Sequence, residues 1–158
     1  WQFPEKLIPL TIKNCLFKKP IPIYGNGRQI RDWIRVEDHV SGILMVLEKG
    51  VSGEKYNIGS NCELTNIQVV SDICKLFDEI RPNPDKSSYL DLITFVEDRP
   101  GHDNRYSIDN NKIISLKWKP KFSWKSGLKD TVEWYLSNED FIKESNKENY
   151  LGDRLGKL

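Results

Sequence analysis

The chain has 158 residues, enough for one domain with a buried core, and 38% of them are hydrophobic, as in globular proteins. Its 24 basic and 23 acidic residues give a net charge of +1. This argues against a nucleic-acid or membrane surface, because such surfaces carry a basic excess. No apolar run reaches the length of a membrane span, and no secretory signal is visible. The three cysteines, Cys15, Cys62 and Cys74, lie far apart, so we expect a reducing cytoplasmic setting without a disulfide framework.

The first fifty residues predict two helices joined by short extended segments. The apolar spacing predicts the first helix from Glu5 to about Phe17, and prolines then keep residues 20–24 extended. Residues 25–27 form a turn, and the alternation that follows predicts a strand from Arg31 to Val36. A second helix is expected from Asp38 to Glu48. Its inward-facing residues are predicted to be Val40, Ile43, Leu44 and Leu47.

A long amphipathic helix is the clearest prediction in the second half of the chain. It runs from Thr65 to Ile80, and Thr65 and Gln68 have the spacing of a capping box. Its predicted buried stripe is Ile67, Val70, Ile73, Cys74 and Phe77. The remaining predicted elements are strands at 55–59 and 92–96, a surface loop at 81–88, helices at 109–116 and from Ser123, and a polar tail at 139–158.

Helices and strands alternate along the chain, so the fold class is α/β. The strands are too few for a complete doubly wound sheet, so we expect mixed helices and short strands with an incomplete sheet. The chain begins with Trp1 in a loop-like stretch, and we therefore expect a piece of a longer protein.

Residues that make or break bonds are not evident in this sequence. Gly25 and Gly27 suggest a dinucleotide fingerprint, but Ile30 stands where its third glycine would be, so we interpret them as a turn. His39 and His102, the only two histidines, have no His or Cys at metal-ligand spacing. We therefore predict no catalytic residue, no cofactor-binding residue and no metal site within the chain.

Two arginine-rich stretches are the most informative feature of the sequence. Residues 24–39 and 97–106 hold five of the seven arginines beside turns and short strands. A guanidinium is planar, always charged and able to hold two oxygens at once, so arginine suits a diphosphate. Arg31 lies at the start of a predicted strand and Arg99 in a turn after another. Both are candidate ligands, although a solvated charge is the common alternative.

Other residues near these arginines are candidates with a plainer alternative. His102 lies between Gly101 and Asp103 in a loop, and it either meets a ligand or is simply solvated. Asn66, at a predicted helix start, either presents its amide beside free backbone N–H groups that suit a phosphate or only satisfies the backbone. Tyr24 either stacks on a base or sugar or belongs to the core.

Several blocks, in order, resemble those of the dTDP-glucose 4,6-dehydratase family, which are extended short-chain dehydrogenases/reductases with a Rossmann-type fold. The blocks are residues 3–10, 23–39, 56–59 and 98–109, with residues 131–136 as a fifth. The block around Arg31 is shared by many nucleotide-sugar enzymes, whereas residues 3–9 and 98–103 are more particular to this family. The resemblance covers residues 1–138 and implies the C-terminal, nucleotide-sugar-binding half of the family's fold.

The resemblance also implies which residues contact the nucleotide sugar, from its base to its diphosphate. These residues are Lys6 and Leu7 at the thymine, Pro22 and Tyr24 at the base and ribose, Arg31, Asn66 and Arg99 at the diphosphate, and His102 beside it. This agrees with the interpretation of Arg31 and Arg99 from their residue type alone.

The family's reaction requires a part that this sequence lacks. These enzymes use a tightly held NAD to oxidise C4 of the glucose, eliminate water across C5 and C6, and return the hydride to C6. The catalytic Tyr and Lys, the Asp–Glu pair and the glycine-rich NAD loop lie in the N-terminal half. The resemblance therefore implies an inactive portion of an NAD-dependent lyase that makes deoxysugar precursors such as those of rhamnose. It also implies a cytoplasmic homodimer.

Two alternatives remain open. A UDP-sugar decarboxylase or epimerase of the same superfamily shares the block around Arg31, although the run from Arg99 to Asp103 speaks against it. A free-standing, non-catalytic nucleotide-sugar-binding module belongs to another class, and apolar surface exposed on the lone half would speak against it.

Overall fold

Four short strands form two separate sheets in the part of the chain that this computed structural model describes, residues 2 and 4–145. In the first sheet, β1 (Ile21–Tyr24) runs parallel to β4 (Ile93–Val96). In the second, β2 (Ile30–Asp32) runs antiparallel to β3 (Glu63–Thr65). The predicted α/β class and incomplete sheet are confirmed.

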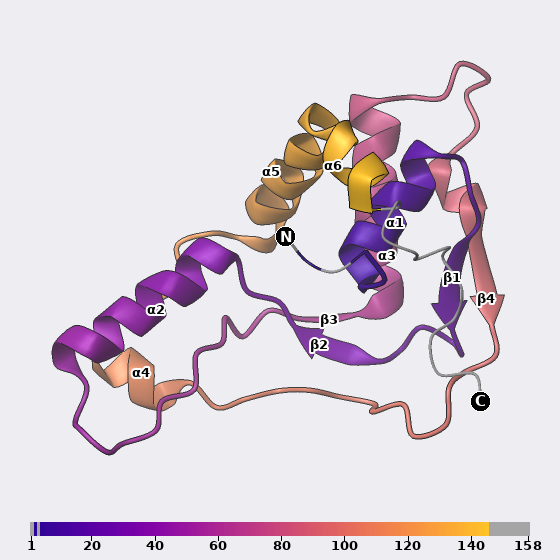
Figure 1. Cartoon of the computed structure of the whole chain (residues 1–158). Coiled ribbons are helices and arrows are strands. Elements are labelled where there is room, and N and C mark those ends of the chain that lie inside the picture. The colour runs from indigo at the N-terminus through magenta and orange to yellow at the C-terminus, as the bar shows by residue number, and fades with distance from the viewer. Residues whose placement is uncertain (1, 3, 146–158) are drawn as a thin grey trace.

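Most helices pack around one core beside the β1–β4 sheet (Figure 1). They are α1 (Leu7–Leu16), α3 (Asn66–Ile80), the 3₁₀ helix η1 (Tyr89–Leu92), α5 (Trp124–Ser137) and α6 (Glu139–Ser145). The predicted stripe of α3 is confirmed at Val70, Ile73, Cys74 and Phe77, which are fully buried, while Ile67 is half-buried. Ile142 of α6 is also buried, within the segment for which the sequence predicts a polar tail. Residues 146–158 of that tail lie outside the described residues.

Two helices begin with the caps that their sequences predict. The Thr65 hydroxyl accepts a hydrogen bond from the Gln68 backbone N–H, and the Gln68 side chain accepts one from the Thr65 N–H. The Ser123 hydroxyl likewise accepts the Ser126 N–H at 3.2 Å. These bonds satisfy N–H groups that the helix itself leaves without partners.

The remaining helices, α2 (Val36–Lys49) and α4 (Asn111–Ser115), form an arm with residues 50–59 that lies apart from the core (Figure 1). The two helices meet through the inner face of α2. A Cβ on Gly42 would lie 2.8 Å from Ile58 and 3.3 Å from Ile113, so only glycine permits this approach without a shift. The indole N–H of Trp118 also donates to the Ser41 hydroxyl at 2.9 Å.

The prediction that Val40, Ile43, Leu44 and Leu47 face inward is wrong. Their exposed fractions are 47%, 43%, 53% and 77%, respectively. The helical period does place them on one face, but no described part of the chain covers that face. We call these four residues the α2 stripe.

Two strand predictions also differ from the structure. Residues 55–59 form no strand, because none of the described strands lies beside them to supply the ladder of hydrogen bonds that a strand requires. The strand predicted from Arg31 to Val36 ends at Asp32, opposite Glu63, where its antiparallel partner β3 begins. Helix α2 then begins at Val36, two residues before its predicted start.

Candidate functional site

The loop that follows β4 lies against the turn between β1 and β2. Gly25 N–H donates to the Val96 carbonyl at 2.9 Å, and Ile30 exchanges backbone hydrogen bonds with Asn104 and Tyr106 at 2.8 and 3.0 Å. These bonds fix both segments at the carboxyl ends of the parallel strands, where α/β folds place ligands. Candidate residues from distant parts of the sequence are therefore brought to one place.

Tyr24 and His102 meet at this place. Their rings contact edge to face, with centroids 6.3 Å apart and planes at 89°. The His102 Nδ1 lies 2.7 Å from an Asp98 carboxylate oxygen, and only 6% of the His102 side chain is exposed. This contact is the largest cause that lowers the pKa of Asp98. The plainer alternative of a freely solvated loop histidine is thus excluded, because the ring is enclosed.

Arg31 is held by two backbone carbonyls and one ring. Its guanidinium donates to the Ile30 carbonyl at 2.7 Å and to the Asp103 carbonyl at 3.1 Å, and it lies 4.2 Å from the centre of the Tyr106 ring. A guanidinium has five N–H groups, so three are left for a ligand.

Arg99 carries a second positive charge into the same neighbourhood. Its backbone N–H donates to Asp98 at 2.9 Å, and its residue is exposed. The pKa of Tyr106 is raised, first by its hydrogen bond to Asp103 and then by desolvation, whereas the charges of Arg31 and Arg99 oppose the rise. The charges of both arginines therefore lie close enough to the Tyr106 hydroxyl to affect its pKa.

Asn66 is the first residue of α3, but the backbone N–H groups beside it are not free. The Asn66 N–H donates to the Gln29 carbonyl and the Ile67 N–H to the Gly27 carbonyl, each at 3.0 Å. The Gln68 N–H is taken by the Thr65 hydroxyl. The suggestion that free helix N–H groups hold a phosphate here is wrong for these three, since the chain satisfies them itself.

The structure thus gathers Tyr24, Arg31, Asn66, Arg99 and His102, which we call the strand-end site. The other predicted residues lie on separate elements or farther back. Pro22 shares the half-buried face of β1 with Tyr24. Lys6 precedes α1 and pairs with Glu5 at 3.1 Å, and Leu7 begins α1 and packs against the core.

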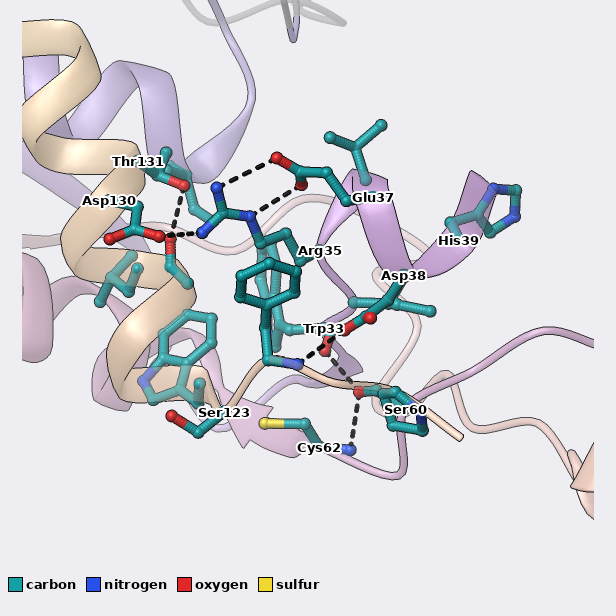
Figure 2. Close-up of a pocket in the computed structure, with 18 of the residues that line it drawn as sticks. Trp33, Arg35, Glu37, Asp38, His39, Ser60, Cys62, Ser123, Asp130 and Thr131 are labelled. Carbon is teal, nitrogen blue, oxygen red and sulfur yellow. Dashed lines mark hydrogen bonds and ion pairs between the residues drawn. The ribbon is translucent and has the colours of Figure 1, made fainter. Parts of the chain in front are cut away.

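A hollow of ≈ 760 Å³ lies elsewhere, between the start of α2 and α5 (Figure 2). Its walls include Trp33, Phe122, Trp124 and Trp134, and none of the eight predicted site residues lines it. The Trp33 indole N–H is buried there without a hydrogen-bond partner. The amino-acid sequence does not predict this hollow, because its walls come from segments about ninety residues apart.

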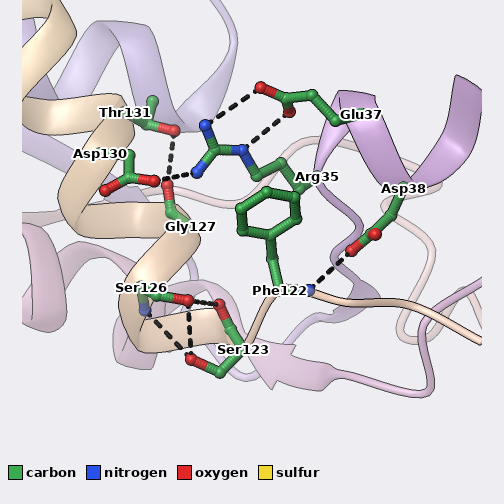
Figure 3. A network of polar contacts seen from close by, with 9 residues as sticks. All are labelled: Arg35, Glu37, Asp38, Phe122, Ser123, Ser126, Gly127, Asp130 and Thr131. Carbon is green, nitrogen blue, oxygen red and sulfur yellow. Dashed lines mark hydrogen bonds and ion pairs between the residues drawn. The ribbon is translucent and has the colours of Figure 1, made fainter.

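Arg35 dominates the polar side of this hollow (Figure 3). It donates to Glu37 at 2.7 and 3.0 Å, is ion-paired with Asp130, and lies 4.2 Å from the centre of the Phe122 ring. The hydrogen bonds to Glu37, with those to Asp130, raise the pKa of the Arg35 guanidinium. Two carboxylates therefore neutralise this cation, so it is a poor anion site. The close pair Arg35 and Glu37 is the one signal in the sequence that points to it.

The Cys62 thiol that lines the hollow is not an activated nucleophile. Burial, and then the charge of Asp32, raise the pKa of the Cys62 thiol, which keeps it protonated. Among the described residues, no group of three His, Cys, Asp or Glu side chains could hold a metal ion. Within the same residues, no helix is both long and apolar enough to cross a bilayer.

Comparison with known proteins gives one consistent group. The family model described as GDP-mannose 4,6 dehydratase matches residues 1–131. A relative from Haemophilus influenzae, described as dTDP-glucose 4,6-dehydratase, is 55% identical over 141 residues, which are 87% of this chain and 42% of the relative.

Two solved structures support the same grouping. A dTDP-glucose 4,6-dehydratase from Bacillus anthracis in complex with NAD is 43% identical, with a TM-score of 0.79 over 92% of this chain and 43% of that chain. A dTDP-glucose 4,6-dehydratase from Streptomyces venezuelae with NAD and TYD bound is 38% identical, with a TM-score of 0.79 over 92% of this chain and 42% of that chain. The chain thus spans less than half the length of the relatives it matches.

Proposed function

Because the chain belongs to the family that the GDP-mannose 4,6 dehydratase model describes, we propose that it is the substrate-binding portion of a dTDP-glucose 4,6-dehydratase. The relatives named for that activity support this choice of substrate. The whole protein would convert dTDP-glucose to dTDP-4-keto-6-deoxyglucose, by oxidation at C4, loss of water across C5 and C6, and return of the hydride.

The strand-end site is the observation that carries the proposal. It combines two arginines, an enclosed histidine and a tyrosine ring at the carboxyl ends of parallel strands. Arg31 and Arg99 would bind the diphosphate, because two charged forks can hold its several oxygens while the hexose reacts. Asn66 and His102 would complete that contact. Tyr24 and Pro22 would line the base and ribose, with Lys6 and Leu7 at the thymine.

The described residues do not fit NAD, so the cofactor would be held by another part of the protein. The turn at Gly25 and Gly27 leads into β2 and not into a helix start, so it offers no cradle for a pyrophosphate. The α2 stripe supports a further part, because such a surface is usually covered by another layer of protein. The isolated chain would therefore be an inactive portion of an NAD-dependent lyase.

The cellular location and the oligomeric state of the whole protein are part of the same proposal. The three cysteines are free thiols, which supports a reducing cytoplasm. The homodimer that the resemblance implies stays a prediction for the whole protein, and light scattering of the whole protein tests it.

Binding of dTDP-glucose to the chain tests the proposed site. We expect weak, saturable binding by NMR titration, and Arg31→Ala should weaken it by a further factor of roughly ten to a hundred, since hydrogen bonds to charged groups contribute about 1.5–3 kcal/mol. Arg28→Ala is the matched control, because Arg28 is an exposed arginine in the segment that leads into β2, three residues before Arg31. It should leave the affinity unchanged.

The competing functions give different results. UDP-glucose binding more tightly than dTDP-glucose would favour a UDP-sugar enzyme. Equal losses from Arg31→Ala and Arg28→Ala would place the nucleotide elsewhere. Turnover of dTDP-glucose by the isolated chain would contradict its inactivity.

A further inference from the structure

The Asp98 carboxylate holds three separate donors at the strand-end site. One oxygen accepts the Arg99 backbone N–H at 2.9 Å and faces His102 Nδ1 at 2.7 Å, and the other accepts the Gln29 side-chain N–H at 2.9 Å. Asp98 thus joins the loop that carries Arg99 and His102 to the turn between β1 and β2.

Two neighbours are shaped around this carboxylate. A Cβ on Gly25 would lie 2.7 Å from the Asp98 Oδ2, and the positive φ of +57° at Gly25 also favours glycine. Gln29 is only 5% exposed and leaves its own Oε1 buried without a partner, while its amide N–H is committed to Asp98. Since a buried unpaired acceptor is costly, the turn is organised to hold Asp98 in place.

This arrangement determines how His102 faces the site. A carboxylate only accepts hydrogen bonds, so Nδ1 carries the proton in this contact. The ring also packs against the Tyr24 ring in a T-shaped contact, which limits its rotation. Within the described part of the chain, Nε2 has no hydrogen-bond partner, so it is the atom left for a ligand.

We propose that Asp98 is a positioning residue: it holds the His102 ring by Nδ1, and Nε2 takes up a proton from solvent when a nucleotide diphosphate binds. The His102 imidazolium then lies between the Asp98 carboxylate and the diphosphate. It donates its Nδ1–H to the carboxylate and its Nε2–H to the diphosphate. This inference rests on the proposed function, and it adds that nucleotide binding is linked to protonation of one histidine.

The pH dependence of binding tests the proposal on the full chain. dTDP-glucose is the probe, because its diphosphate is a diester and does not titrate near neutrality. Among the described residues, the titratable groups in contact with the ring are Asp98 from its own loop and Tyr24 from β1. We expect the Kd to rise with pH by at most about tenfold per unit, as uptake of one proton requires.

Three variants separate positioning from a loss of structure. Asp98→Asn should weaken binding by about threefold to tenfold at roughly pH 7 and flatten the pH dependence, since an amide does not stabilise the imidazolium. His102→Gln should abolish the pH dependence. Asp85→Asn is the control, because Asp85 also accepts a backbone N–H in an exposed loop but lies outside the site. Asp85→Asn should change neither the affinity for dTDP-glucose nor its pH dependence.

The histidine signals give a second measurement that does not depend on affinity. The chain has two histidines, so long-range ¹H–¹⁵N spectra show each ring, and His39 is the exposed reference. We expect the His102 proton on Nδ1, and loss of that preference in Asp98→Asn.

The outcomes distinguish the two proposals. Failure of the wild-type chain to bind dTDP-glucose would overturn the proposed function. Binding that does not depend on pH, or a flattening in Asp98→Asn no greater than in Asp85→Asn, would overturn the role of Asp98 and leave the proposed function intact. If Asp98→Asn does not fold, His102→Gln and the wild-type spectra still decide the question.

Discussion

Helix α3 and helix α2 have the same kind of apolar spacing and opposite surroundings. In α3, Val70, Ile73 and Phe77 are 0% exposed, because α1, η1 and α5 pack around them. In α2, the stripe from Val40 to Leu47 is 43–77% exposed. The comparison teaches that a helical period identifies an apolar face but not the protein that covers it.

The largest expected effect separates these two faces directly. Phe77→Ala should reduce the free energy of unfolding by about 3–5 kcal/mol, because it leaves a cavity beside the Tyr89 ring, whose centroid is 5.1 Å away. Leu47→Ala should change it by only about 0.5 kcal/mol, as for most surface positions. Urea unfolding followed by circular dichroism measures both. Equal losses would mean that the α2 stripe is covered in solution, which a dependence on chain concentration would reveal.

An intermediate effect is expected where the arm is tied to the core. Asp38 is 2% exposed and accepts the backbone N–H groups of Lys121 and Phe122 at 2.8 and 3.1 Å, in the segment that leads into α5. Asp38→Ala should cost about 1–3 kcal/mol, because both donors lose a charged partner. Hydrogen exchange should show reduced protection of the backbone amides in α2 and unchanged protection in α3. Glu37→Gln is the control, since its ion pair with Arg35 is exposed and should contribute less than about 1 kcal/mol.

The smallest expected effect is on the stability of the fold at low pH. Hydrogen bonds from Arg105, and then Ser107, lower the pKa of Glu63 to about 2 in the folded chain. This carboxylate therefore contributes stability above its ordinary pKa of 4.5, and the contribution is lost as pH falls from there to about 2. Glu63→Gln should lower the melting temperature near pH 7 slightly and reduce its fall in acid. Glu48→Gln, on the exposed face of α2, should leave the acid dependence as it is in the wild type.

Local signals in the sequence predicted much of the fold correctly. The cap of Thr65 and Gln68, the buried stripe of α3 and the resemblance to dehydratases are confirmed. Each depends on residues close together or on blocks in a fixed order. The predicted strand at residues 55–59 and the predicted burial of the α2 stripe were wrong. A strand needs a neighbouring strand and a buried face needs another element packed on it, and the sequence of the segment itself specifies neither.

The candidate site likewise combines residues that the sequence identifies with contacts that only the fold reveals. Arg31 and Arg99 stood out because the chemistry of arginine suits a diphosphate at any position. The packing of Tyr24 against His102, and the Gln29 and Gly27 carbonyls that occupy the N–H groups at the start of α3, join segments about forty to eighty residues apart. No spacing rule connects such segments, so only the folded arrangement reveals them.

The close approach of Gly25 to Asp98 has a consequence for how these positions can evolve. Any side chain at position 25 meets the carboxylate at 98, and it also requires a backbone conformation that few residues adopt. A change at either position alone is therefore disfavoured, and relatives that have changed one should have changed the other. The two positions, seventy-three residues apart, would then vary as a pair across the family.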